Sequence, residues 1–142
     1  MGYWETFYHL VWATKDRLPV IDASRQTIID RSFRHTCREG GAVVHAVGIM
    51  PDHVHLAISI PPRWSVSNLV RDLKISATHA VNRDPNAVFR GTFAWQPEFG
   101  VFTFDASRLE YVVAYVLNQR EHHAATTIRP RLEQSDRDGA PL

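Results

Sequence analysis

The stretch AVVHAVGIMPDHVHLAISI, residues 42–60, decides the fold. Its halves, 42–49 and 53–60, have the length and the β-branched content of strands, and the Met-Pro-Asp segment between them is typical of a tight turn. The second half alternates, so one face carries Val54, Leu56, Ile58 and Ile60. We therefore expect two adjacent antiparallel strands whose aliphatic face lies on the core.

The rest of the chain predicts strands and helices around this hairpin. Apolar and aromatic residues at 3–14 and 99–104 indicate two further strands. Helical spacing, N-capping residues and a closing glycine pair indicate helices from Asp22 or Ser24 to Gly40-Gly41, from Ser65 through Val81, and from 105 to 123, the last opened by a capping box at 107–110. Residues 84–98 are expected to be mostly loop. The order βαββαβα predicts an α+β fold, ferredoxin-like or RRM-like, with an antiparallel sheet and the helices packed on one face.

Length and composition set the broad class. The 142 residues suffice for one domain, which we place at 3–123 and follow with a flexible tail at 124–142. No apolar run reaches the roughly 18 residues of a membrane span, and the single cysteine fits a reducing cytoplasm. The net charge is only +1, which does not by itself indicate a nucleic-acid partner. Of the 16 basic residues only Lys15 and Lys74 are lysines, and arginine grips phosphate well, although codon usage explains the bias equally.

His53 and His55 are the first candidate functional residues. Strand alternation puts both imidazoles on the face opposite the aliphatic row, with Cα atoms roughly 6.5–7 Å apart. From there both rings can reach one divalent metal ion. A His-x-His pair also arises by chance on exposed strand faces, so a third ligand is needed to decide.

The last predicted helix offers that ligand and a nucleophile. Tyr111, Tyr115, Gln119 and His122 fall within one arc, apart from the aliphatic side of the helix. Tyrosine hydroxyl, with a pKa of about 10, needs help to act as a nucleophile at neutral pH. A metal held by two imidazoles and an amide oxygen supplies it by polarising a phosphodiester. The alternative is that the tyrosines are ordinary half-buried residues at the rim of the core.

Five segments in chain order resemble the single-tyrosine HUH transposases of the smallest bacterial insertion sequences and their relatives, the REP-associated tyrosine transposases. The Met-Pro-Asp-His-Val-His run and a tyrosine followed four residues later by glutamine carry most of the resemblance. The segments are HLVWATK (9–15), GIMPDHVHL (48–56), SIPP (59–62), FAWQ (93–96) and YVLNQ (115–119).

The resemblance implies a DNA strand transferase. His53, His55 and Gln119 match the ligands of Mg²⁺ or Mn²⁺, and Tyr115 matches the nucleophile that forms a 5′-phosphotyrosine link to single-stranded DNA and frees a 3′-OH. Tyr111 is the competing nucleophile. Members of this family commonly act on DNA hairpins and often as homodimers, so we expect both of this chain.

Some residues depart from the family pattern or stay open. Arg120 stands where many relatives have an acidic residue, and His122 and His123 are alternative ligands that favour a zinc-like site. Candidate DNA contacts near the second helix are phosphate-binding or stacking residues, each of which is also an ordinary surface residue. They are Arg63, Trp64, Arg71, Lys74, Arg83 and Arg90.

Two other functions remain open at this point. The first is a host-domesticated protein of the REP-associated type, which would keep the chemistry. The second is a non-catalytic single-stranded nucleic-acid-binding module that uses the sheet and its aromatics, for which the histidines would be dispensable.

Overall fold

Four antiparallel strands form one sheet in the computed structural model, which describes residues 2–86, 92–119, 133 and 135. The spatial order is β2-β3-β1-β4, so β1 and β3 are central. The predicted hairpin is confirmed, because β2 and β3 pair antiparallel and the Met50 N–H donates to the His53 carbonyl at 2.8 Å. The strands are β1 (Tyr8–Ala13), β2 (Val43–Ile49), β3 (His53–Ser59) and β4 (Gly100–Thr103).

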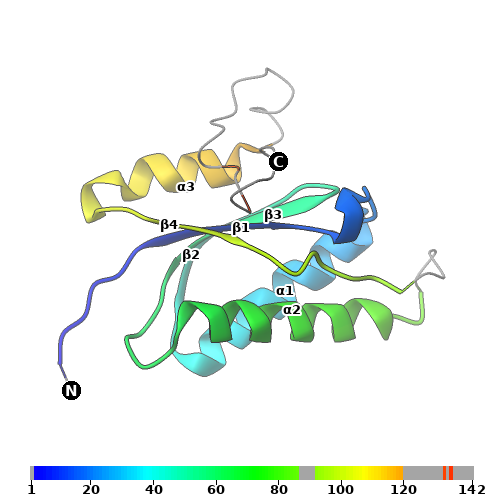
Figure 1. The fold of residues 1–142 in the computed structure, drawn as a ribbon, viewed down its shortest axis with the longest axis horizontal. Helices are drawn as coiled ribbons and strands as arrows, with labels where there is room; N and C mark the ends of the chain where they lie inside the picture. Colours follow the sequence, from blue (N-terminus) through cyan, green and yellow to red (C-terminus); the bar gives the residue numbers. More distant parts are fainter. Residues whose placement is uncertain (1, 87–91, 120–132, 134, 136–142) are drawn as a thin grey trace.

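Helices cover both faces of this sheet. α1 (Ala23–Gly40) and α2 (Val66–Asn82) lie side by side on one face, and α3 (Leu109–Leu117) lies on the other (Figure 1). The α+β class, the element order and the antiparallel sheet are confirmed. The placement of α3 differs from the expected single helical layer. The histidine-bearing face carries small side chains such as Ala46 and Ala57, and α3 packs against them.

The main core lies between the sheet and the pair α1–α2. It takes the alternate aliphatic residues of β3, as predicted, and the fully buried Trp12 of β1. Trp12 meets the rings of Phe33 and Trp95 edge to face, with centroids 5.6 and 6.0 Å away. A second, smaller cluster under α3 consists of Ala46, Ala57, Val112 and Val116. The two layers are therefore packed very differently.

The ends of α1 and α2 follow the predicted signals. Asp22 accepts a hydrogen bond from the Arg25 N–H at 2.8 Å, Gly41 ends α1 with a φ of 83°, and Ser65 caps α2. The capping box predicted at 107–110 is wrong. Asp105 accepts from the Ser107 N–H instead, and the 3-10 turn η2 (Ala106–Arg108) precedes α3.

Strand boundaries are shorter than predicted at the start of the chain. β1 begins at Tyr8 rather than at residue 3. Before it, the Thr6 hydroxyl, and not the strand backbone, makes the hydrogen bonds to the Ile60 N–H and carbonyl. Pro61 and Pro62 follow directly and prevent further pairing on that side. Residues 120–123 of the predicted last helix lie outside the described residues. Within the described part of the chain, no helix is long and apolar enough to cross a membrane.

Candidate functional site

The histidine pair lies between the sheet and α3. β3 places His53 and His55 on the same face, as predicted, and their ring centroids are 5.1 Å apart. Both side chains are buried. Two imidazoles covered in this way need defined partners, because an unpaired buried polar group is costly.

The Nδ1 atom of each histidine lies within hydrogen-bonding distance of another side chain. His53 Nδ1 lies 2.7 Å from the Asp52 Oδ1, and His55 Nδ1 lies 2.8 Å from the Nε2 of His9. A His53 that donates through Nδ1 presents a lone pair at Nε2 when it is neutral. The proton shared by His9 and His55 can sit on either ring. When it sits on His55 Nδ1 and the ring is neutral, Nε2 is unprotonated, which is the state that a metal ligand requires. Burial, followed by repulsion from His55, lowers the pKa of His9 to about 3, so His9 stays neutral.

Glu133 completes the group in front of the histidines. Its Oε1 lies 3.1 Å from His55 Nε2 and 3.6 Å from His53 Nε2, and the side chain is fully buried. Burial alone would raise the pKa of Glu133, but hydrogen bonds from His53 and His55, the charge of His55 and a hydrogen bond from Tyr115 hold it well below its usual value. The pKa of His53 is raised, because contacts with Asp52 and Glu133 outweigh the burial that would lower it.

The two candidate tyrosines are separated by the structure. Tyr115 is only 3 % exposed, and its hydroxyl donates to the Oε2 of Glu133 at 2.6 Å. Its ring centroid lies 6.2 Å from that of His55. Tyr111 is 42 % exposed, and the Arg108 guanidinium lies 5.2 Å from the centre of its ring. Of the two, Tyr115 has its hydroxyl at the histidine pair.

Gln119 is buried two residues after the end of α3. Its Nε2 donates to the Tyr115 carbonyl at 2.9 Å. Its buried Oε1 has no hydrogen-bond partner among the described residues. A buried amide oxygen without a partner among the described residues is one that a cation could satisfy, so Gln119 as the third ligand stays a prediction.

Ligand atoms of His53, His55 and Glu133 all lie within 4.8 Å of one another. Imidazole nitrogens with carboxylate or amide oxygens form a donor set that suits a divalent metal ion. This arrangement fits a metal-dependent enzyme. The alternative ligands His122 and His123, and Arg120 beside them, lie outside the described residues.

Sequence reasoning missed Glu133, His9 and Asp52. Glu133 stands in a polar segment without periodicity, 78 residues from His55, so no pattern indicated it. Asp52 and His9 fall in segments that carry the family resemblance, but their contacts depend on strand register. His9 is opposite Ala57 in the β1–β3 ladder, which places its ring diagonally across from His55.

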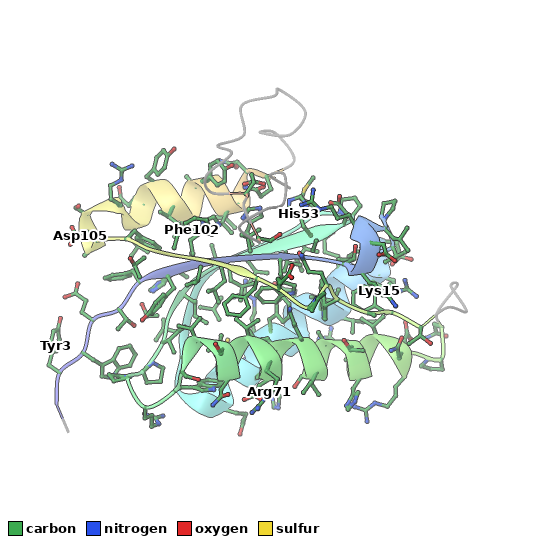
Figure 2. The ribbon with its side chains drawn as sticks, viewed as in Figure 1. Tyr3, Lys15, His53, Arg71, Phe102 and Asp105 are labelled. Atoms are coloured by element: carbon green, nitrogen blue, oxygen red, sulfur yellow. The ribbon has the colours of Figure 1, made fainter. Side chains whose placement is uncertain are left out.

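The predicted DNA contacts lie at α2 and its flanks, on the other side of the sheet. Figure 2 shows Arg71 on α2 and His53 beyond the strands. Several of these residues are engaged in the fold: Lys74 donates to the Gln96 and Glu98 carbonyls at 2.8 and 3.0 Å, Arg63 to the Gly40 carbonyl, and Arg83 to the His79 carbonyl. Trp64 packs partly buried against the main core, and Arg90 lies outside the described residues. DNA binding by this group stays a prediction.

Comparison with known proteins gives matches along most of the chain. The family model described as "Transposase IS200 like" matches residues 2–119. The ISDra2 transposase TnpA of Deinococcus radiodurans is 27 % identical over 124 residues, which cover 84 % of this chain and 89 % of that protein. The transposase for insertion sequence element IS200 of Salmonella typhimurium is 28 % identical over 71 residues, 50 % of this chain and 47 % of the relative.

Two solved structures share the fold. A crystal structure of a candidate transposase from Deinococcus radiodurans R1 aligns with a TM-score of 0.64 and 27 % identity, over 84 % of this chain and 95 % of that one. A REP-associated tyrosine transposase bound to a REP hairpin aligns with a TM-score of 0.65 and 15 % identity, over 100 % and 98 %. The second likeness is one of fold alone.

Proposed function

The chain belongs to the IS200-like transposase family, and from this premise we propose that it cuts and rejoins single-stranded DNA with Tyr115 as the nucleophile. The observation that carries the proposal is the position of the Tyr115 hydroxyl. It lies in a buried cluster with the His53–His55 pair, bound to the carboxylate that also meets the two Nε2 atoms. Tyr111, the competing residue, faces solvent.

The reaction that we propose transfers a phosphoryl group without water. The Tyr115 oxygen forms a bond to phosphorus, and the bond from phosphorus to the 3′ oxygen breaks. The hydroxyl of Tyr115 gives up one proton and the leaving 3′ oxygen takes one up, so the step is neutral in protons. The product is a 5′-phosphotyrosine and a free 3′-OH, and the reverse reaction on another 3′ end rejoins DNA.

We propose that His53, His55 and Gln119 hold Mg²⁺ or Mn²⁺. When bound, the metal polarises the phosphate and stabilises its developing negative charge. The residues behind the ligands keep the histidine rings in place: Asp52 holds His53, and His9 holds His55. The orphaned Gln119 Oε1 supports its assignment as a ligand.

The proposed substrate is single-stranded DNA with a hairpin. Support comes from the family and from the structural neighbour, which is bound to a REP hairpin. We also propose a homodimer in the cytoplasm and a catalytic domain over 3–123. The predicted tail at 124–142 lies outside the described residues, except for Glu133 and Ser135, which are buried. Arg63, Trp64, Arg71, Lys74, Arg83 and Arg90 remain proposed DNA contacts.

A covalent-adduct assay tests the mechanism. Labelled single-stranded oligonucleotides from both flanks of the gene are incubated with the protein and Mn²⁺, and adducts are resolved on a denaturing gel. We expect an adduct that is lost with Tyr115→Phe, with His53→Ala and with a chelator. Tyr111→Phe is the matched control, because it removes a hydroxyl from the same helix outside the site, and it should keep the adduct.

The other outcomes are equally informative. If the adduct is lost with Tyr111→Phe but kept with Tyr115→Phe, the nucleophile is Tyr111 and our assignment of Tyr115 is wrong. DNA binding without any adduct, unaffected by His53→Ala, favours the non-catalytic binding module. An active enzyme whose gene lacks flanking ends repeated elsewhere in the genome favours the domesticated protein.

A further inference from the structure

Glu133 contacts both halves of the candidate site. One oxygen, Oε1, faces the Nε2 atoms of His53 and His55 at 3.6 and 3.1 Å. The other, Oε2, accepts the hydrogen bond from Tyr115 at 2.6 Å. One carboxylate therefore contacts the two imidazoles and the Tyr115 hydroxyl.

We propose that Glu133 links the metal to the nucleophile, with Oε1 as a metal ligand and Oε2 as the acceptor that orients the Tyr115 hydroxyl. This inference rests on the proposed function and deepens it. The expected ligand set then becomes two histidines with oxygens from Glu133 and Gln119. Glu133 acts on catalysis as a positioning residue for Tyr115.

The chemistry requires a carboxylate for this double contact. A carboxylate has acceptor lone pairs on both oxygens, so it can bind a cation on one side and a hydroxyl proton on the other. When the Tyr115 O–H points at Glu133, it is the lone pairs of the tyrosine oxygen, and not its proton, that can face phosphorus. The full burial of Glu133 sharpens both contacts, because water cannot compete for either oxygen.

An amide in the same place can make only one of the two contacts. In Glu133→Gln, the carbonyl oxygen either faces the metal or accepts from Tyr115, and the NH₂ group occupies the other side. An NH₂ group cannot bind a cation, and one that faces Tyr115 uses a lone pair of the tyrosine oxygen. Glu133→Asp keeps the charge but is one methylene shorter, so it too reaches one side only.

Two measurements separate the roles. Mn²⁺ affinity of the full-length protein without DNA, measured by calorimetric titration, reports the ligand role. We expect Glu133→Gln and Glu133→Ala to lose about 10- to 100-fold in affinity, and Tyr115→Phe to change it less than about twofold. The rate of adduct formation at saturating Mn²⁺ reports the orienting role, and we expect at least a tenfold loss in Glu133→Gln, Glu133→Asp and Glu133→Ala.

The control is Glu110→Gln, which neutralises an exposed carboxylate on α3 and should change neither quantity. Thermal melting of each variant checks that it folds, and Glu133→Asp keeps the test valid if the alanine variant does not. Unchanged Mn²⁺ affinity in both Glu133→Ala and Glu133→Gln, each folded, overturns the ligand role. An unchanged or increased adduct rate overturns the orienting role, and an increase would mean that Glu133 obstructs the site.

A failure of the proposed function gives a different experimental result from a failure of this inference. If the wild-type protein binds Mn²⁺ but forms no adduct, the proposed reaction fails. The titrations of Glu133→Ala and Glu133→Gln still decide whether Glu133 is a ligand.

Discussion

Gly48 fixes the distance between β2 and α3, and its replacement tests how strictly that distance matters. Gly48 is opposite His55 in the β2–β3 ladder and lies under the backbone of Val116, the residue after Tyr115. A Cβ at Gly48 would overlap the Val116 carbonyl oxygen and lie 3.1 Å from the carbonyl carbon, whereas ordinary contact begins at 3.4 Å. Because the obstacle is backbone, relief requires α3 to move away from the sheet by about 1 Å.

The size of the effect follows from this displacement. Overpacking of a close interface typically costs about 1–3 kcal/mol of folding free energy. A misplacement of about 1 Å at a reacting group can cost about 100-fold in rate. We therefore expect Gly48→Ala to lower the thermal midpoint measurably and to slow adduct formation by one to two orders of magnitude.

Gly40→Ala is the matched control, measured by the same adduct rate and melting curve. A Cβ at Gly40 would overlap the ring of Trp64, which packs against the main core. Stability should fall while the adduct rate per folded molecule stays near the wild-type value. A Gly48→Ala protein with wild-type rate and midpoint would refute the idea that close docking of α3 positions Tyr115.

Two further predictions concern residues that sequence reasoning missed or assigned to DNA. His9→Phe removes the partner of His55 Nδ1 but keeps an aromatic ring, so we expect Mn²⁺ affinity to fall about 10- to 100-fold in a calorimetric titration, with little change in secondary structure by circular dichroism. Lys74→Met removes the hydrogen bonds to the Gln96 and Glu98 carbonyls and should cost about 1–3 kcal/mol in urea denaturation. Burial lowers the pKa of Lys74 from 10.5 to about 8, so between those values the unfolded chain binds more protons and wild-type stability relative to Lys74→Met should rise with pH. A flat difference across that range would contradict the assignment of Lys74 to a half-buried structural role.

The sequence predicted those parts of the site that follow from local periodicity. Strand alternation was enough to put His53 and His55 on one face, because side-chain direction in a strand repeats every two residues. Helical spacing grouped Tyr115 with Gln119 but could not separate Tyr115 from Tyr111. Two residues four apart share a helix face, and only the position of α3 over the sheet decides which one is buried.

Other features depend on tertiary contacts that no local pattern encodes. The Glu133 contact joins an irregular segment to β3 and α3, and the His9 contact needs the register of β1 against β3. The sequence did not predict the second helical layer, because the face with the histidines carries no row of large aliphatic residues. Its alanines, Ala46 and Ala57, are the feature that admits α3.

The unequal packing of the two layers has a functional consequence. Tyr115 is almost wholly buried, so a DNA phosphate can reach its hydroxyl only if something covering it moves. α1 and α2 are fixed by the large main core, whereas the small cluster holds α3 mainly through Val112 and Val116. Burial of a valine contributes about 1.5–3 kcal/mol, so these two side chains hold α3 with about 3–6 kcal/mol, and the hydrogen bond from Tyr115 to Glu133 adds to this. The helix that carries the proposed nucleophile therefore has the smaller apolar contact with the sheet, and specific polar contacts at Tyr115 help to hold it in place.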